Sequence, residues 1–175
     1  MAFCATVGER WRRGFDRLPA PGDLARWYAE AGVSDVPVPV TSADLRTARD
    51  LREAVYRTAE AIIDGRPPAA RDQRIINRAA ATPPPVPRMS LGVVTLTAAA
   101  PGPAASALSA VARDAIALFT TADARRLREC ASPECGLLFL DVSRPGRRRW
   151  CSSNACGGKA RAATYRQRQA PASPG

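Results

Sequence analysis

The sequence predicts a mainly α-helical fold with a small β component, in which a helical N-terminal domain precedes a small module made of a β-hairpin and a helix. Three observations lead to this prediction. Apolar residues recur at steps of three and four through much of the first 124 residues, which is the spacing of one face of an α-helix. Prolines and glycines mark the ends of those periodic segments. Four of the five cysteines lie close together after residue 129, around a short apolar run.

Three helices are expected before residue 82. A short amphipathic helix covers residues 23–31, directly after a Pro-Gly pair. Thr41 and Asp44 form a capping pattern for a second helix, whose apolar positions from 45 to 62 share one face and which ends at Gly65. A third helix covers residues 71–81. These helices supply the predicted core of the N-terminal domain.

Proline-rich segments separate the later elements. Residues 82–87 contain four prolines and form a stiff connector, because each proline fixes its own φ and restricts the residue before it. Residues 91–97 are rich in β-branched side chains and are expected to form a strand, and residues 104–119 form a fourth helix. The last residues, 170–175, contain only Pro, Ser, Ala and Gly and are predicted to be a disordered tail.

The composition excludes several kinds of active site. The chain has no histidine, which removes His-based acid–base catalysis, Ser-His-Asp and Cys-His triads and Cys₂His₂ fingers. No paired-carboxylate, triad or cofactor motif is found, so we expect a protein that is not an enzyme. The net charge is +10, and residues 125–168 hold eleven basic against three acidic side chains. Positive charge is therefore concentrated in this segment.

The compartment expected from the sequence is the cytoplasm. Glu9 and Arg10 interrupt the N-terminal segment before an apolar signal sequence can form. The longest uncharged stretch, residues 89–112, is broken by Pro101-Gly102-Pro103 and is poor in Leu, Ile and Phe, so it does not predict a membrane helix. Structural disulfides are rare in the cytoplasm, and clustered cysteines there point to metal or redox chemistry.

The cysteine cluster has the spacing of a zinc site. Cys130 and Cys135 form one Cys-x₄-Cys pair, Cys151 and Cys156 form another, and fifteen residues separate the pairs. Two such pairs suit tetrahedral coordination of one Zn²⁺ by four thiolates, which leaves no open position for catalysis. The sequence therefore predicts one structural Zn²⁺ bound by these four residues. Cys4 stands alone in an apolar segment and is expected to be a small core residue.

The residues around the cysteines predict a treble-clef-like zinc module. Residues 137–140 form a buried strand, residues 143–146 a turn, and residues 147–150 the returning strand of a hairpin. A helix then runs from Cys156 to about residue 168. Small residues of this helix, at 160, 163, 164 and 167, share an arc and are expected to pack on the hairpin.

Four segments of this module resemble the CGNR zinc finger. They are Cys130–Gly136, Leu138–Asp141, Arg148–Ser152 and Cys156-Gly157. The motif that names the family reads Cys156-Gly157-Gly158-Lys159 here, so the Asn-Arg pair is replaced. Lysine keeps the charge of the arginine but loses its bidentate fork. The resemblance implies zinc binding, while the replaced pair puts any contact made by the family's Asn-Arg in doubt.

A second, looser resemblance covers the N-terminal domain. Residues 6–10 and 23–27 resemble the opening of ABATE, a helical domain that precedes this finger in bacterial stress-induced transcription regulators. The resemblance implies an ABATE-like domain over 1–124, a zinc finger over 125–169 and the tail after it. It also implies that the N-terminal domain senses a small effector or binds a protein partner.

The charge of the module predicts a nucleic-acid partner, with DNA favoured over RNA and no membrane. A run of three arginines precedes Cys151, and four cations lie on the following helix around Tyr165. The candidate nucleic-acid contacts are Arg147, Arg148, Arg149, Lys159, Arg161, Arg166 and Arg168.

Other interpretations of the module remain open. Its cations are also compatible with an acidic protein partner or a merely solvated face. Two further alternatives are a redox sensor that releases zinc on oxidation and an RNA-binding zinc-ribbon protein.

Overall fold

A computed structural model describes residues 1–98 and 102–169, and the tail predicted over 170–175 lies outside them. In chain order the elements are η1 (Cys4–Thr6), β1 (Val7–Gly8), β2 (Phe15–Asp16), α1 (Pro21–Glu30), α2 (Ser42–Ile63), α3 (Ala70–Ala80), β3 (Val86–Ser90), β4 (Val93–Thr97), α4 (Pro103–Thr120), η2 (Ala122–Arg126), β5 (Leu127–Glu129), β6 (Leu138–Leu140) and α5 (Cys156–Gln169). The strands pair into two-stranded antiparallel sheets, β1 with β2, β3 with β4 and β5 with β6. The predicted class, mainly α with a small β component, is confirmed.

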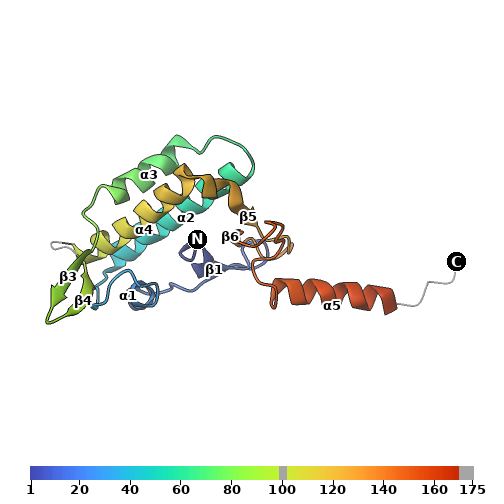
Figure 1. Ribbon diagram of the computed structural model, residues 1–175, viewed down its shortest axis with the longest axis horizontal. Coiled ribbons are helices and arrows are strands. Elements are labelled where there is room, and N and C mark those ends of the chain that lie inside the picture. Colours follow the sequence, from blue (N-terminus) through green and yellow to red (C-terminus); the bar gives the residue numbers. More distant parts are fainter. Residues whose placement is uncertain (99–101, 170–175) are drawn as a thin grey trace.

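The long helices α2, α3 and α4 lie side by side and form the body of the molecule (Figure 1). All four helices predicted before residue 120 are present, with boundaries shifted by three residues or fewer. The predicted cap of α2 is confirmed, because the Thr41 hydroxyl accepts a hydrogen bond from the Asp44 N–H and the Asp44 carboxylate accepts one from the Thr41 N–H. The buried faces of α1, α2 and α4 meet in one core around Leu24, Leu51 and Leu108.

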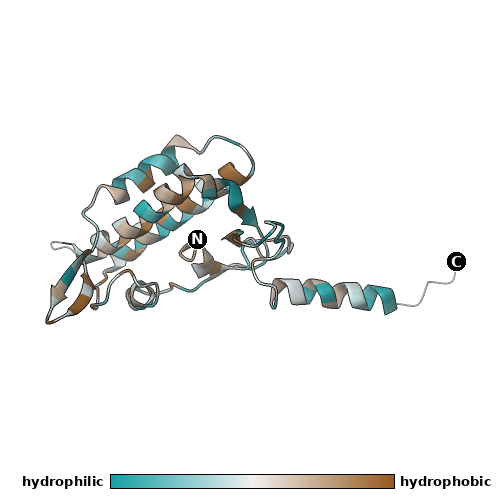
Figure 2. Ribbon diagram, in the orientation of Figure 1, coloured by the Kyte–Doolittle hydropathy of each residue, from teal (hydrophilic) through white to brown (hydrophobic). Residues whose placement is uncertain are grey.

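The segment after α3 is a β-hairpin rather than a connector followed by one strand. The predicted connector 82–87 includes the start of β3, which pairs with β4 across a turn at Leu91-Gly92. Pro87 is tolerated in β3 because it lies opposite Leu96, whose own backbone N–H and C=O bond to Asp35 instead. The hairpin exposes several apolar side chains at one end of the molecule (Figure 2).

The hairpin of the cysteine-rich module is formed by different strands from those predicted. Residues 138–140 form β6 as expected, but residues 147–150 form no strand, and β6 pairs instead with β5, which precedes the first cysteine. The reason is burial, because Leu127 of β5 and Leu138 of β6 both enter the core of the N-terminal domain. The module therefore shares a core with the helices rather than standing apart from them.

The last helix, α5, projects away from the body (Figure 1). Only its first turn contains a buried residue, Gly157, and side chains beyond Ala163 are exposed. The expected packing of the small-residue arc on the hairpin is thus wrong for Thr164 and Gln167, because the β5–β6 hairpin lies against α2. No helix in the described ranges has the length and apolar character needed to cross a membrane.

Candidate metal centre

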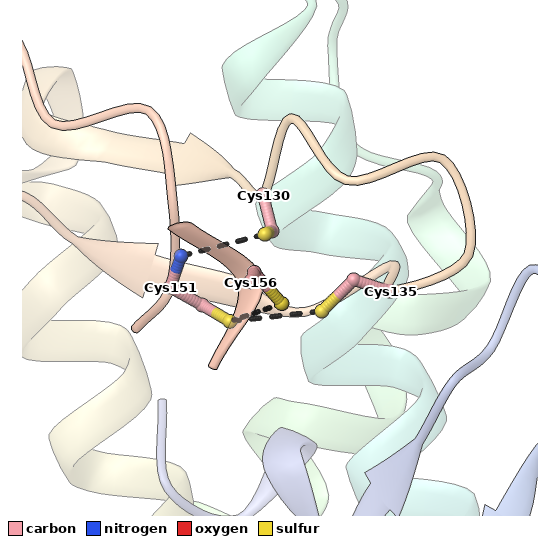
Figure 3. A group of neighbouring side chains, drawn as sticks. All are labelled: Cys130, Cys135, Cys151 and Cys156. Atoms are coloured by element: carbon pink, nitrogen blue, oxygen red, sulfur yellow. Dashed lines mark hydrogen bonds between the residues drawn. The ribbon is translucent and has the colours of Figure 1, made fainter. Parts of the chain in front are cut away.

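The four predicted zinc ligands come together in the structure (Figure 3). Cys130 follows β5, Cys135 lies in the loop before β6, Cys151 lies in the segment between β6 and α5, and Cys156 begins α5. Their sulfur atoms all lie within 4.8 Å of one another, with Cys151 3.6 Å from Cys135 and 3.7 Å from Cys156. Tetrahedral Zn–S bonds of about 2.3 Å place the sulfurs about 3.8 Å apart. The cluster is therefore positioned to bind one metal ion and fits Zn²⁺.

The surroundings of the cluster are those of a closed structural site. Cys130 and Cys135 are buried and Cys151 and Cys156 half-buried, and Leu137, Phe139 and Trp150 pack around them. None of the four is in a disulfide. Four thiolates complete a tetrahedral sphere, so the ion would tie chain segments together and would not present an open coordination position.

The protein environment gives the thiols different pKa values. Burial acts to raise the pKa of Cys130, but backbone N–H groups of Cys151 and Ser132 donate to its sulfur and the net shift is below the ordinary value of 9.0. Burial raises the pKa of Cys135 to about 11 and also raises that of Cys151. A bound cation favours the thiolate form of all four, so metal binding releases protons.

Gly157 of the Cys-Gly pair is closely packed. A Cβ at this position would lie 3.1 Å from Cδ1 of Trp150 and 3.5 Å from the carbonyl oxygen of Ser152. At Gly158, where the family motif has Asn, a Cβ would meet only the guanidinium of Arg161, at 4.0 Å. The departure Gly158-Lys159 therefore leaves the packing around the cysteines intact.

A buried carboxylate that the sequence reasoning missed organises the basic loop after β6. Asp141 is 1% exposed and accepts hydrogen bonds from the Ser143 N–H and hydroxyl and from the Arg148 N–H. The Ser143 hydroxyl and the two backbone donors hold the pKa of Asp141 below its ordinary value, although burial acts in the opposite direction. The local signal was an Asp two residues before a Ser at a turn, which is the pattern of an Asx turn.

The candidate nucleic-acid contacts lie on two exposed segments. Arg147, Arg148 and Arg149 are exposed on the loop that Asp141 organises. The guanidinium of Arg148 is also used internally, because it donates to the carbonyls of Trp150 and Cys151 and lies 4.9 Å from the ring of Phe139.

The candidate contacts on α5 are all exposed. Arg161 donates to the Ser153 carbonyl at 3.1 Å, near the start of the helix. Arg166 and Arg168 lie in the last turns, where α5 is farthest from the body (Figure 1). The structure therefore brings the four sulfurs together and leaves these cations spread along a free surface.

Cys4 is separate from this site. It lies in the main core with 2% exposure, as predicted, and burial raises its pKa to about 11.

Comparison with protein-family models gives two matches that together span most of the chain. Residues 1–122 match ABATE, described as "Putative stress-induced transcription regulator", and residues 126–169 match the CGNR zinc finger. No curated protein matches the sequence. The second match contains all four cysteines, so both resemblances inferred from the sequence are confirmed.

Proposed function

The chain belongs to the ABATE family and ends in a CGNR zinc finger, and on this premise we propose that it is a transcription regulator whose zinc module binds duplex DNA. In this proposal the protein acts in the bacterial cytoplasm, in a stress response. Its N-terminal domain binds a protein partner or a small effector. The function is binding, with no catalytic step.

The observation that carries the proposal is the excess of positive charge on α5 and on the loop before it. Residues 142–169 contain eight basic side chains and no Asp or Glu. Zn²⁺ with four thiolates adds a charge of about −2, so the surface stays strongly positive when the metal is bound. An exposed surface with this excess of positive charge attracts phosphates and releases their counterions.

The shape of α5 supports DNA as the partner. Its fourteen residues make a helix about 21 Å long and 10–12 Å wide, and the major groove of B-DNA is about 12 Å wide. Arg166, Arg168 and the exposed Tyr165 lie on the projecting part, which nothing in the described chain covers. The zinc ion would supply structure, fixing α5 to the body through Cys156.

Fluorescence anisotropy on mixed-sequence duplex DNA, titrated across salt, tests the proposal. Zinc-loaded protein is expected to bind at low salt. The Arg166→Ala/Arg168→Ala variant is expected to bind more weakly and to lower the slope of log K against log salt by about 1 to 2, since each phosphate contact contributes about 0.9.

The matched control removes two exposed arginines from α3, Arg71 and Arg74, and so changes the net charge equally. This variant should keep the wild-type slope. An equal loss in both variants, or no binding at low salt, would contradict the proposal. Competition with structured RNA decides between the nucleic acids, and preferential displacement of DNA by RNA would favour the RNA-binding alternative.

Zinc release on oxidation is a second candidate function. It is favoured because two of the four ligands are only half-buried, so that an oxidant can reach them. Cys151 and Cys156 are half-buried, while Cys130 and Cys135 are buried. Hydrogen peroxide would take two electrons from two thiolates, and with two protons would yield one disulfide, two waters and a free Zn²⁺. A zinc-sensitive dye should report release on mild peroxide treatment, and retention of zinc by oxidant-treated protein would count against this role.

A further inference from the structure

We infer that Tyr56 and the loop 9–14 of the N-terminal domain are positioning elements of the metal centre, which hold Cys135 in place for the ion. They act through the backbone of the first ligand loop, residues 130–136. The N-terminal domain would then set the affinity and lifetime of the bound zinc. This inference stands independently of DNA binding, because it concerns only the metal site.

The main-chain carbonyls at Cys135 and Gly136 both accept hydrogen bonds from the N-terminal domain. The backbone N–H of Arg10 donates to the Cys135 carbonyl at 3.2 Å, and the Tyr56 hydroxyl of α2 donates to the Gly136 carbonyl at 2.9 Å. Tyr56 is 4% exposed, so its hydrogen bond is shielded from water. Groups that fix a ligand's backbone in this way tune metal affinity without touching the metal.

Close packing at Gly136 adds to these hydrogen bonds. Its φ is +61°, and a Cβ there would lie 2.8 Å from Cβ of Arg10 and 2.9 Å from Nε1 of Trp11. The loop 9–14 therefore lies directly against the backbone that follows Cys135. No side chain fits between them at this position.

The other end of the ligand loop is held by the same N-terminal segment. The Trp11 indole N–H donates to the Glu129 carboxylate at 2.7 Å, one residue before Cys130. Arg12 lies 3.5 Å from the Glu134 carboxylate, one residue before Cys135. Contacts of loop 9–14 thus flank both cysteines of the first pair.

The positioning groups are themselves fixed by the N-terminal core. The Arg10 guanidinium pairs with both carboxylate oxygens of Glu53, at 2.8 and 3.2 Å, and lies 3.9 Å from the ring centre of Tyr56. Glu53 also accepts from Arg52, which is 4% exposed and pairs with Asp16 of β2. The contacts of Arg10 and Tyr56 with the ligand loop are therefore supported by a partly buried network of ion pairs.

The second pair of ligands is held differently. The Ala131 N–H donates to the Arg149 carbonyl at 2.8 Å, and the Cys151 N–H donates to the sulfur of Cys130 at 3.4 Å. These contacts lie within the module itself. The N-terminal domain thus supports the first half of the site, and a bound metal ion would add to the two hydrogen bonds that join it to the half that carries α5.

The test is the zinc affinity of full-length Tyr56→Phe, which removes one hydroxyl. We expect zinc to bind about tenfold more weakly and to transfer faster to a competing chelator, with a shift of the visible d–d bands when Co²⁺ replaces zinc. The matched control is Tyr28→Phe, because Tyr28 is also buried and donates to a carbonyl, that of Ala104 at 3.4 Å, but lies in the helical core. It should keep wild-type zinc affinity and Co²⁺ bands.

Equal zinc affinity, transfer rate and Co²⁺ spectrum in wild type and Tyr56→Phe would overturn the inference, as would an equal loss in both tyrosine variants. Where Tyr56→Phe fails to fold by circular dichroism, Trp11→Phe replaces it, because Trp11 is 53% exposed and its loss spares the core. That variant is expected to weaken zinc binding and shift the Co²⁺ bands in the same direction. Wild-type zinc binding by Trp11→Phe would then refute the positioning role of loop 9–14.

Discussion

Two features of the structure disfavour a side chain at position 136, the left-handed backbone of Gly136 and its close contact with loop 9–14. Its φ of +61° disfavours any side chain, and a Cβ would approach Arg10 to 2.8 Å. Gly65, with a φ of +66°, has the same backbone strain, but a Cβ there would meet no atom within 4 Å. A comparison of the two glycines therefore distinguishes the cost of the left-handed backbone from the cost of the close contact.

We predict that Gly136→Ala lowers the free energy of unfolding more than Gly65→Ala does. The left-handed conformation costs both variants about 1–2 kcal/mol, and the clash at Gly136 adds to that cost. Urea denaturation of zinc-loaded protein measures the difference. Equal losses for the two variants would show that loop 9–14 moves aside without penalty.

The carboxylates of the partly buried network around Arg52 predict how stability depends on pH. Burial acts to raise the pKa values of both Asp16 and Glu53. Hydrogen bonds from Arg52 and the Leu18 N–H hold the pKa of Asp16 below its ordinary 3.8, and Arg10 and Arg52 hold that of Glu53 below its ordinary 4.5. Because the folded-state values are the lower ones, their stabilisation is complete above the ordinary values. It is lost as pH falls from there through the folded-state values.

Asp16→Asn is the variant that tests this dependence. It should lower the free energy of unfolding by about 1–3 kcal/mol near neutral pH, because Arg52 loses a charged partner. The further decrease in the free energy of unfolding as the pH falls should be smaller than in wild type. Denaturation at a series of pH values measures both effects, with Asp50→Asn as an exposed control on α2, the helix that carries Arg52. A decrease in the free energy of unfolding with falling pH as steep as in wild type would contradict the role assigned to Asp16.

Among the elements, the β3–β4 hairpin has a turn whose sequence does not suit its backbone. Leu91 has a φ of +48°, is fully exposed and precedes Gly92, which has a φ of +77°. Two-residue turns with both φ positive favour Asn-Gly. The hairpin forms in spite of this residue, because Asp35 and Ser34 bond to Leu96 at the other end of β4.

We predict that Leu91→Asn raises the free energy of unfolding by about 0.5–1 kcal/mol, since asparagine tolerates the left-handed conformation. Thermal unfolding checks the gain. Leu91→Ala removes the same exposed side chain without that tolerance and should show no gain. A gain of equal size in Leu91→Ala would attribute the effect to lost apolar exposure.

The helix α5 depends on the metal more than any other helix does. Its one buried residue is Gly157 in the first turn, whereas β5 and β6 are anchored in the main core by Leu127 and Leu138. Chelation of zinc is therefore expected to release α5 and the loop before it while α1 to α4 keep their structure. Hydrogen exchange before and after chelation measures this, and a loss of protection in α2 equal to that in α5 would contradict it.

Local patterns predicted the elements, and long-range packing decided their partners. The helices and the zinc ligands could be predicted because periodicity, capping and cysteine spacing are properties of neighbouring residues. The partner of β6 could not, since β5 is three residues long and its position is set by burial of Leu127 in a distant core. The contacts of Arg10 and Tyr56 with residues 135 and 136 likewise join positions with no shared local signal.

At the scale of the whole molecule, the shared core predicts that the two family segments are not separable at the boundary between them. A fragment ending at residue 122 lacks Leu127 and Leu138, each of which is buried. Loss of such a side chain typically costs about 2–5 kcal/mol. We expect this fragment to unfold at a lower temperature than one ending at residue 141, which keeps β5 and β6. Equal melting temperatures for the two fragments would show that β5 and β6 do not stabilise the helices.

The position of Leu127 and Leu138 in that core also constrains the order of events during synthesis. The segment containing η1, loop 9–14 and α2 leaves the ribosome long before residues 127–138, yet it packs against them in the finished protein. The apolar surface beside α2 that Leu127 and Leu138 cover therefore stays uncovered by them while more than sixty residues after α2 are translated. The fourth cysteine, Cys156, follows these strands in the chain, so all four ligands can meet only after the segment that packs beside α2 has been translated.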